Sequence, residues 1–339
     1  MITTRYYYSR LNERDKKIYN AIYDGIMRYK SEVEVPGVNL SDSLVGKIYH
    51  CVLWDNPFIF SVGEYAMWHA LSDDGKRIRM TTLCDNTSEK EFRRQIENTV
   101  NEFLKNTKLR DLDDFQKEVF VHDYVINNIE YDNTLGNNGS RIEPYTVYGA
   151  LIEHRAVCEG IAKTVKLLLN MLDVQCIVVT GEYEGNGHSW NIVKIDGESY
   201  NLDVTMDMGR VIHPGYIRYD YFNFQTGEIP QYSIIKGFEI PNCKSTNSNY
   251  VIRAAGFVSN FDSLVHYVEL CLKKRRRCMF FKANRDDNDE YSHVSFDRFK
   301  KEVERGCIEV SRKLGIHISC FIDVSGPCEI VNVEITYKL

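Results

Sequence analysis

Cys158 stands directly before a run of apolar residues that recur at helical spacing. The N-terminus of a helix carries backbone N–H groups without partners and the positive end of the macrodipole, and both favour a thiolate. The same N–H groups can bind an oxyanion. Position alone leaves two interpretations open, a nucleophile or a small buried apolar residue. The predicted buried stripe of this helix consists of Ile161, Val165, Leu168, Leu169 and Leu172.

A β-hairpin is predicted some thirty residues further along. Residues 188–195 (HSWNIVKI) and 198–205 (ESYNLDVT) both have the composition of strands, and Asp196-Gly197 joins them. Asp-Gly between two such runs is a strong signal for a two-residue loop. A loop of this length fixes the register of the two strands, so that Ile195 faces Glu198.

Counting outward from this loop brings chemically active side chains together. Trp190 faces Asp203, and His188 shares the face of Trp190 because it lies two residues away. His188 and Asp203 are then diagonal neighbours, within reach of a hydrogen bond. A carboxylate on one imidazole nitrogen fixes the tautomer and leaves the other nitrogen to take a thiol proton. The hairpin and the predicted helix therefore indicate a triad of Cys158, His188 and Asp203, although each residue alone has an ordinary structural interpretation.

Three sequence blocks resemble bacterial members of the transglutaminase-like superfamily in both composition and order. They are CEGIA (158–162), GHSWNIV (187–193) and YNLDVT (200–205), and the resemblance extends over about residues 115–225. It implies a papain-like core, in which a helix bearing the cysteine packs on an antiparallel sheet bearing the histidine and aspartate. Carried over to this sequence, it makes Cys158 the nucleophile, His188 the general base and later acid, and Asp203 the orienting carboxylate.

The resemblance is weaker at positions that would line the substrate groove. Glu159 follows the cysteine where tissue-type transglutaminases have tryptophan, and Met206 stands where many members have tryptophan. These departures concern substrate choice more than thiol chemistry. For the oxyanion we expect the backbone N–H of Cys158 and a second donor, for which Tyr148 is favoured over Tyr145. We expect Trp190 to shield the thiol and imidazole from water.

The chain is long enough for several folding units, because its 339 residues exceed the usual size of one domain. We predict a mostly helical N-terminal domain with a hairpin over 1–108, a catalytic core over 109–242 and a small α+β domain over 243–339. The predicted fold class is α+β throughout. Predicted helices cover 40–52, 88–105, 111–130, 261–273 and 295–314, and predicted strands outside the core cover 58–68, 76–83, 250–258, 278–283, 316–323 and 328–337.

Composition excludes several classes of protein. The chain is 43% hydrophobic and 27% charged with a formal charge of −6, which argues against disorder and against a polyelectrolyte partner. Its ten cysteines include no C-x-x-C pair, so zinc-knuckle and thioredoxin motifs are absent, and we expect no cofactor and no obligatory metal. We see neither a signal peptide nor a run of about 18 apolar residues, so a cytoplasmic protein without membrane contact is expected. The basic run 273–277 is interpreted as a solvated helix end rather than a nucleic-acid site.

Two function classes remain open. The first is a cysteine-dependent acyltransferase, peptidase or amidase acting on a protein or peptide through a thioester. The second is a non-catalytic peptide-binding module that keeps the fold. The sequence does not determine the substrate, the choice between water and an amine as acceptor, or the oligomeric state.

Overall fold

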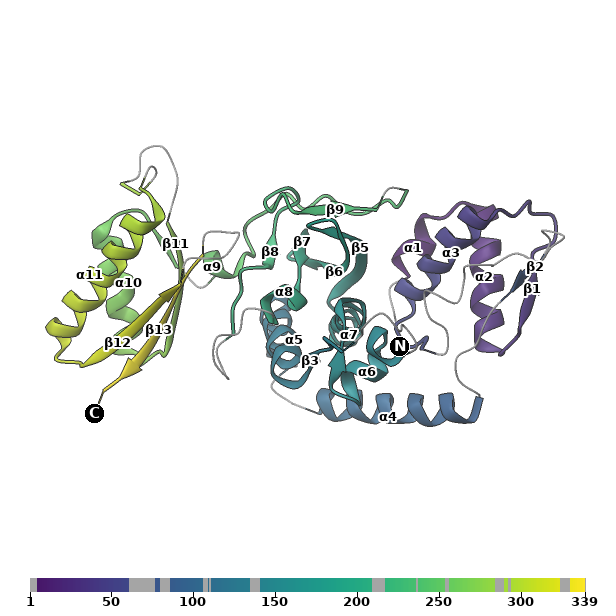
Figure 1. The fold of residues 1–339 in the computed structure, drawn as a ribbon, viewed down its shortest axis with the longest axis horizontal. Helices are drawn as coiled ribbons and strands as arrows, with labels where there is room; N and C mark the ends of the chain where they lie inside the picture. The colour runs from purple at the N-terminus through teal and green to yellow at the C-terminus, as the bar shows by residue number, and fades with distance from the viewer. Residues whose placement is uncertain are drawn as a thin grey trace.

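The chain is arranged in three parts along its long axis, with the largest sheet in the middle part (Figure 1). The computed structural model combines helices with mainly antiparallel sheets, so the predicted α+β class is confirmed. None of the described helices is long and apolar enough to cross a bilayer. The structure describes residues 5–60, 77–79, 86–105, 109, 111–134, 141–208, 217–235, 237–253, 256–283, 290–291, 294–323 and 330–338.

The N-terminal part is a small helical layer with one short two-stranded sheet. The second helix begins where Asn12 accepts a hydrogen bond from the backbone N–H of Asp15, as expected for an N-cap. Part of the predicted hairpin over 58–68 and 76–83 lies outside the described residues. Residues 77–79 do form a strand, but it pairs with residues 32–34, and residues 58–60 are not a strand. The elements are α1 (Tyr6–Arg10), α2 (Glu13–Met27), β1 (Glu32–Glu34), α3 (Asp42–Asp55) and β2 (Arg77–Arg79). The next helix, α4 (Asn86–Leu104), packs on the central part, because its Ile96, Val100 and Phe103 belong to that core.

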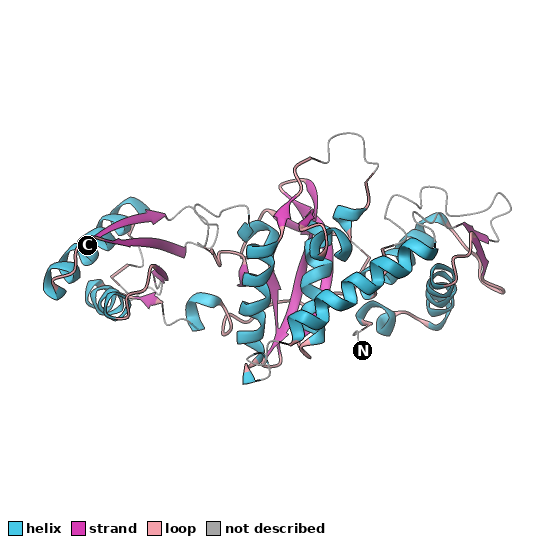
Figure 2. Cartoon of the chain, turned by 90° about the horizontal axis from the view of Figure 1, so that it is seen from below, coloured by secondary structure: helices cyan, strands magenta, loops and turns pink. Residues whose placement is uncertain are grey.

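The central part is an antiparallel sheet with helices packed against it, and Figure 2 shows those helices in front of its strands. The strand order is β8-β7-β6-β5-β9. The strands are β5 (Gln175–Tyr183), β6 (Asn186–Ile195), β7 (Glu198–Leu202), β8 (Phe222–Phe224) and β9 (Tyr232–Ile234). The other elements are α5 (Asp114–Asn128), β3 (Glu130–Tyr131), the 3₁₀ turn η3 (Glu143–Tyr145), α6 (Val147–Leu151), β4 (Arg155–Ala156), α7 (Cys158–Met171) and α8 (Val204–Met208).

Helix α7 is the centre of the core. Its residues from Glu159 to Leu169 are all buried, since α5, α6 and the sheet surround it. One polar side chain also joins the helix to the sheet: Asn191 of β6 donates to the carbonyl oxygens of Ala162 (2.9 Å) and Ile177 (3.1 Å). The cysteine-bearing helix is therefore fixed directly against the strand that bears the predicted histidine.

The predicted register of the β6–β7 hairpin is confirmed, with Ile195 opposite Glu198 and Asn191 opposite Leu202. The predicted length of the second strand is wrong, because β7 ends at Leu202 and α8 begins at Val204. Asp203 explains the change. Its side chain accepts from the backbone N–H of Met206 (3.1 Å), so it acts as the N-cap of α8 and turns the chain out of the sheet.

The C-terminal part is a four-stranded sheet of order β10-β11-β13-β12 covered by two helices. The elements predicted from 261 onward are confirmed to within two residues at each end. The strand predicted over 250–258 is wrong in its first half, because Asn249 accepts from the N–H of Val251 and starts a short helix there. The elements are α9 (Tyr250–Arg253), β10 (Phe257–Val258), α10 (Phe261–Lys273), β11 (Cys278–Ala283), α11 (Phe296–Leu314), β12 (Ile318–Asp323) and β13 (Ile330–Tyr337).

Candidate active site

Cys158 is the first residue of α7 and is half-buried. The N-cap residue is Val157, whose side chain makes no capping hydrogen bond. The first backbone N–H groups of any helix have no acceptor within the helix. In α7 no side chain of the N-cap residue takes that place. This is the arrangement that the sequence predicts, with a thiol beside N–H groups that can hold a negative charge.

The start of α7 is held tightly in place. Gly160 allows the turn η3 to approach, because a Cβ at this position would lie 2.3 Å from the carbonyl oxygen of Pro144. One turn further along, the Lys163 ammonium forms a buried ion pair with Glu159 and donates to the carbonyl oxygen of Tyr145 (3.3 Å). Glu159, the residue after the cysteine, is thus paired within the protein, and this ion pair fixes the helix terminus.

His188 lies between the other two members of the predicted triad. Its Nε2 is 2.5 Å from Oδ2 of Asp203, and the Cys158 thiol lies within electrostatic reach of the imidazole. A carboxylate only accepts, so Nε2 carries the proton of this bond and Nδ1 remains available to take a proton from a thiol. Burial lowers the pKa of the imidazole, but Asp203 and Cys158 more than offset that effect and raise the pKa to about 10.

Asp203 accepts two hydrogen bonds besides that of His188. One comes from the backbone of Met206, and the other from the hydroxyl of Tyr232, which is 2.6 Å from Oδ2. Burial, followed by the charge of Asp203, raises the pKa of Tyr232 well above its usual range, so the hydroxyl remains a donor. Tyr232 lies on the edge strand β9, and no local signal in the sequence predicts its contact with Asp203.

Aromatic side chains enclose the His188–Asp203 pair. The indole of Trp190 lies nearly parallel to the imidazole of His188, with 6.1 Å between centroids and 17° between planes, and it meets Tyr232 edge-on at 5.0 Å. Trp190 is buried, and its Nε1 donates to Asn201 (3.1 Å). Its indole therefore covers one side of the imidazole, the position expected of a residue that shields it from water.

Tyr131 lies within electrostatic reach of the Cys158 thiol. It pairs with Ala156 between the strands β3 and β4, two residues before Cys158. Burial, followed by the electrostatic effect of Cys158, raises the pKa of Tyr131 to about 12. Tyr148, the oxyanion donor favoured from the sequence, instead packs against Phe92 of α4 with 4.2 Å between ring centroids. Among the described contacts, none joins Tyr148 to the three predicted catalytic residues.

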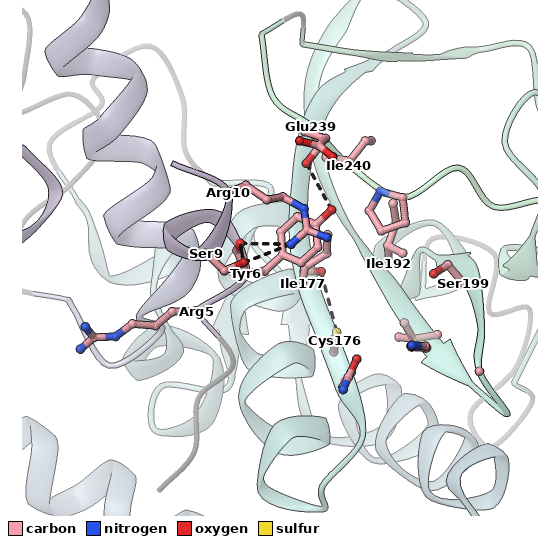
Figure 3. Close-up of a pocket in the computed structure, with 15 residues that line it drawn as sticks. Arg5, Tyr6, Ser9, Arg10, Cys176, Ile177, Ile192, Ser199, Glu239 and Ile240 are labelled. Atoms are coloured by element: carbon pink, nitrogen blue, oxygen red, sulfur yellow. Dashed lines mark hydrogen bonds between the residues drawn. The ribbon is translucent and has the colours of Figure 1, made fainter. Parts of the chain in front are cut away.

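A separate pocket of about 610 Å³ lies between α1 and the strands β5 and β6 (Figure 3). Arg10 and Glu239 bring opposite charges to it, and the Tyr6 hydroxyl donates to the carbonyl oxygen of Glu239 (3.2 Å). The residues lining this pocket do not include Cys158, His188 or Asp203, so it is distinct from the candidate active site.

Comparison with known proteins agrees with the resemblance found in the sequence. Residues 101–204 match the family model of the transglutaminase-like superfamily. Similar solved structures include a TGase (19% identity over 40% of this chain and 36% of that one, TM-score 0.30) and a candidate cysteine protease from Cytophaga hutchinsonii (20% identity over 34% and 37%, TM-score 0.25). The chain thus spans little more than a third of the length of either protein, and no curated protein matches it. The resemblance to the transglutaminase-like superfamily is therefore confirmed over residues 101–204, which contain Cys158, His188 and Asp203.

Proposed function

We propose that this protein is a thiol enzyme that transfers or hydrolyses the acyl group of a peptide or glutamine amide. The observation that carries the proposal is the 2.5 Å bond between His188 and the capping carboxylate Asp203, with the Cys158 thiol at the start of α7 within electrostatic reach of the imidazole. A helix, a strand and a helix N-cap would supply the nucleophile, the base and the orienting carboxylate that nucleophilic thiol catalysis requires.

In the first half of the reaction, the Cys158 thiolate attacks the amide carbonyl. The tetrahedral oxyanion is held by the N–H groups at the start of α7. The carbon–nitrogen bond then breaks, and the leaving nitrogen takes the proton carried by His188, which leaves a thioester on the cysteine. Tyr131 is better placed than Tyr148 to act as a second oxyanion donor, since its phenol lies within the electrostatic reach of Cys158.

In the second half of the reaction, an acceptor resolves the thioester. His188 removes a proton from water or from a primary amine, the new bond forms at the carbonyl carbon, and the thiolate leaves. Water gives a peptidase, amidase or deamidase, whereas an amine gives an isopeptide bond. The substrate is proposed to be a protein or peptide because the core matches the transglutaminase-like superfamily.

A glutaminyl peptide incubated with the enzyme, with and without a primary amine, distinguishes these outcomes by mass. Deamidation adds about 1 Da, amine transfer adds the mass of the amine less about 17 Da, and proteolysis splits the peptide; the shifts follow from exchange at a thioester. We expect one of these products from the native chain and none from Cys158→Ala.

The matched control is Cys278→Ser, which removes a half-buried thiol of β11 in the C-terminal sheet. It should keep full activity, and Cys158 should react with iodoacetamide well below pH 8 whereas Cys278 should not. Turnover that persists in Cys158→Ala would refute the assignment. A Cys158 thiol no more reactive than Cys278 would favour a non-catalytic peptide-binding module.

A further inference from the structure

A chain of hydrogen bonds leads from Asp203 into the interior, away from His188. The backbone N–H of Asp203 donates to the carbonyl oxygen of Tyr221 (2.9 Å), and the N–H of Tyr221 donates to Oδ1 of Asp207 (3.1 Å). Oδ2 of Asp207 in turn lies 3.1 Å from Nε2 of His122 on α5. All four residues are almost completely buried.

His122 is held between two carboxylates. Its Nδ1 lies 3.0 Å from Asp123, whose carboxylate accepts from the Tyr219 hydroxyl (2.9 Å), and the ring also stacks on Tyr219. Burial lowers the pKa of His122, but Asp123 and Asp207 outweigh that effect and raise the pKa to about 9. The two carboxylates favour the cationic form of the ring, in which both nitrogens donate.

Helix α8 needs an anchor of this kind. It has only five residues, and an isolated helix of that length is not stable in water. Asp203 caps its first turn, and Asp207 lies one turn later, where the backbone N–H of Asp207 bonds to the carbonyl oxygen of Asp203. A displacement of Asp207 would consequently rotate the Asp203 carboxylate relative to His188.

We propose that the buried pair of His122 and Asp207 positions the catalytic carboxylate: it anchors α8 so that Asp203 stays aimed at His188. This inference rests on the proposed function, because it assigns positioning residues to the same site. Neither residue touches the thiol or the imidazole of His188 in the described structure, so their effect on the reaction acts through Asp203.

Two substitutions of His122 test the proposal as a matched pair. In His122→Gln the side-chain amide nitrogen lies as many bonds from the backbone as Nε2, so the bond to Asp207 survives. In His122→Asn the amide reaches only the position of Nδ1, so the bond to Asp207 is lost while that to Asp123 can form. A merely structural role for the imidazole would make the two variants behave alike.

We expect His122→Asn to lower kcat on the order of 10- to 100-fold, because small misplacements of catalytic groups cost that much. The KM should change less than about twofold, since no binding group is removed. The downfield proton NMR signal of the His188–Asp203 hydrogen bond should weaken or move upfield. In His122→Gln both kcat and this signal should stay close to those of the native chain.

Equal losses in the two variants, or an unchanged His188 signal in His122→Asn, would overturn the proposal. If His122→Asn does not fold, a comparison of Asp207→Asn with Asp207→Leu tests the same contact. Of these two variants, only the asparagine can still accept a hydrogen bond from His122. The NMR signal requires no turnover. It therefore tests the positioning role even if the Cys158→Ala experiment refutes the proposed function.

Discussion

At the scale of single residues, the geometry of the site depends on the hydrogen-bond donors of the Asp203 carboxylate. It accepts from His188, from the Tyr232 hydroxyl and from the backbone of Met206. The two additional donors fix the orientation of the carboxylate before substrate arrives, so that little reorganisation is needed when the imidazolium forms. Tyr232 therefore supports the proposed triad without being part of it.

Asp203→Asn should shift the pH dependence of activity in a defined direction. The carboxylate is the main factor that raises the pKa of His188 to about 10 against burial, so its loss must lower that pKa. The alkaline limb of the kcat/KM profile, where the imidazolium loses its proton, should then move to lower pH. The rate should fall on the order of 10³- to 10⁴-fold, as for the carboxylate of other triads.

The measurement is kcat/KM from pH 6 to 11, with Tyr232→Phe as the control. The control keeps the ring against Trp190 and removes only the hydroxyl, so its alkaline limb should move less. Its rate should fall on the order of 10- to 100-fold, as for one lost hydrogen bond to a charged group. An alkaline limb that stays in place in Asp203→Asn would remove Asp203 from its assigned role.

At the scale of elements, the sequence predicted what local pattern determines. The Asp-Gly loop fixed the β6–β7 register, and the start of the apolar stripe placed Cys158 at the beginning of α7. Tyr232 could not be predicted, because β9 joins the far edge of the sheet. That pairing depends on Gly181, where a Cβ would lie 2.0 Å from the carbonyl oxygen of Ser233.

The contact of His122 with Asp207 was also beyond prediction. The two residues are 85 positions apart, and nothing in either segment indicates which helix face meets the other. The end of β7 was predictable in principle, since aspartate is a preferred N-cap residue and Asp203 can accept from the N–H three residues further along. In the sequence, however, the alternation of apolar residues continues through Val204, and this favoured a longer strand.

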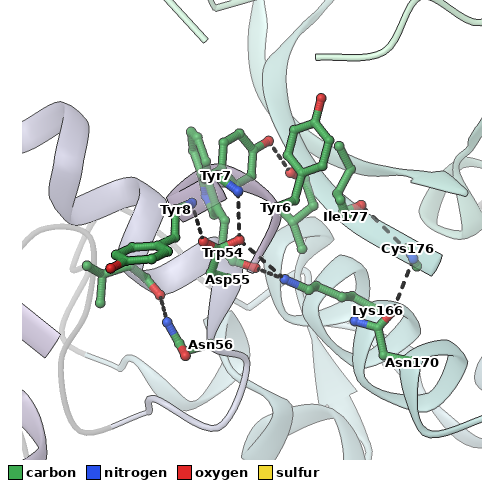
Figure 4. Close-up of polar contacts among 12 residues, drawn as sticks. Tyr6, Tyr7, Tyr8, Trp54, Asp55, Asn56, Lys166, Asn170, Cys176 and Ile177 are labelled. Carbon is green, nitrogen blue, oxygen red and sulfur yellow. Dashed lines mark hydrogen bonds and ion pairs between the residues drawn. The ribbon is translucent and has the colours of Figure 1, made fainter. Parts of the chain in front are cut away.

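A buried ion pair joins the N-terminal helices to α7 (Figure 4). Lys166 is fully buried; its ammonium donates to the carbonyl oxygen of Trp54 (2.5 Å) and lies 3.9 Å from Asp55, and burial lowers its pKa to about 8. Asp55 also accepts from the N–H groups of Tyr7 and Tyr8. The pair therefore links three elements, α1, α3 and the helix that carries Cys158.

Lys166→Met should lower the free energy of unfolding by about 3–5 kcal/mol, because it leaves the buried Asp55 carboxylate without its cation. Adding Asp55→Asn removes that charge while keeping an acceptor for Tyr7, so the double variant should be less destabilised than the sum of the single ones. Urea unfolding of all four proteins gives the coupling free energy. Strict additivity would show that the pair contributes nothing.

At the scale of the whole molecule, the C-terminal part contacts residues 218–221, the segment that bonds to Asp203. Arg218, which is only 2% exposed, forms ion pairs with Asp220 and with Asp323 of β12. The next residue, Tyr219, stacks on Tyr250 at 3.6 Å between centroids. Two residues further along, the backbone of Tyr221 bonds to both Asp203 and Asp207, as described above.

This connectivity predicts that a substitution in the C-terminal sheet reaches the active site. Asp323→Ala should reduce kcat about fivefold, which corresponds to roughly 1 kcal/mol of lost positioning. Its ion pair with Arg218 is the direct link to the segment that holds Tyr221. The control is Lys282→Ala, which breaks another ion pair between the C-terminal sheet and the core, with Glu228 at 3.4 Å.

Because the described bonds of Glu228 go to Gln225 and Lys282 and not to residues 218–221, the control should leave kcat unchanged. If both substitutions reduce kcat equally, the C-terminal part acts on the core only through general stability. If only Asp323→Ala does so, and the His188–Asp203 NMR signal weakens with it, the C-terminal sheet helps to position the Asp203 carboxylate through residues 218–221.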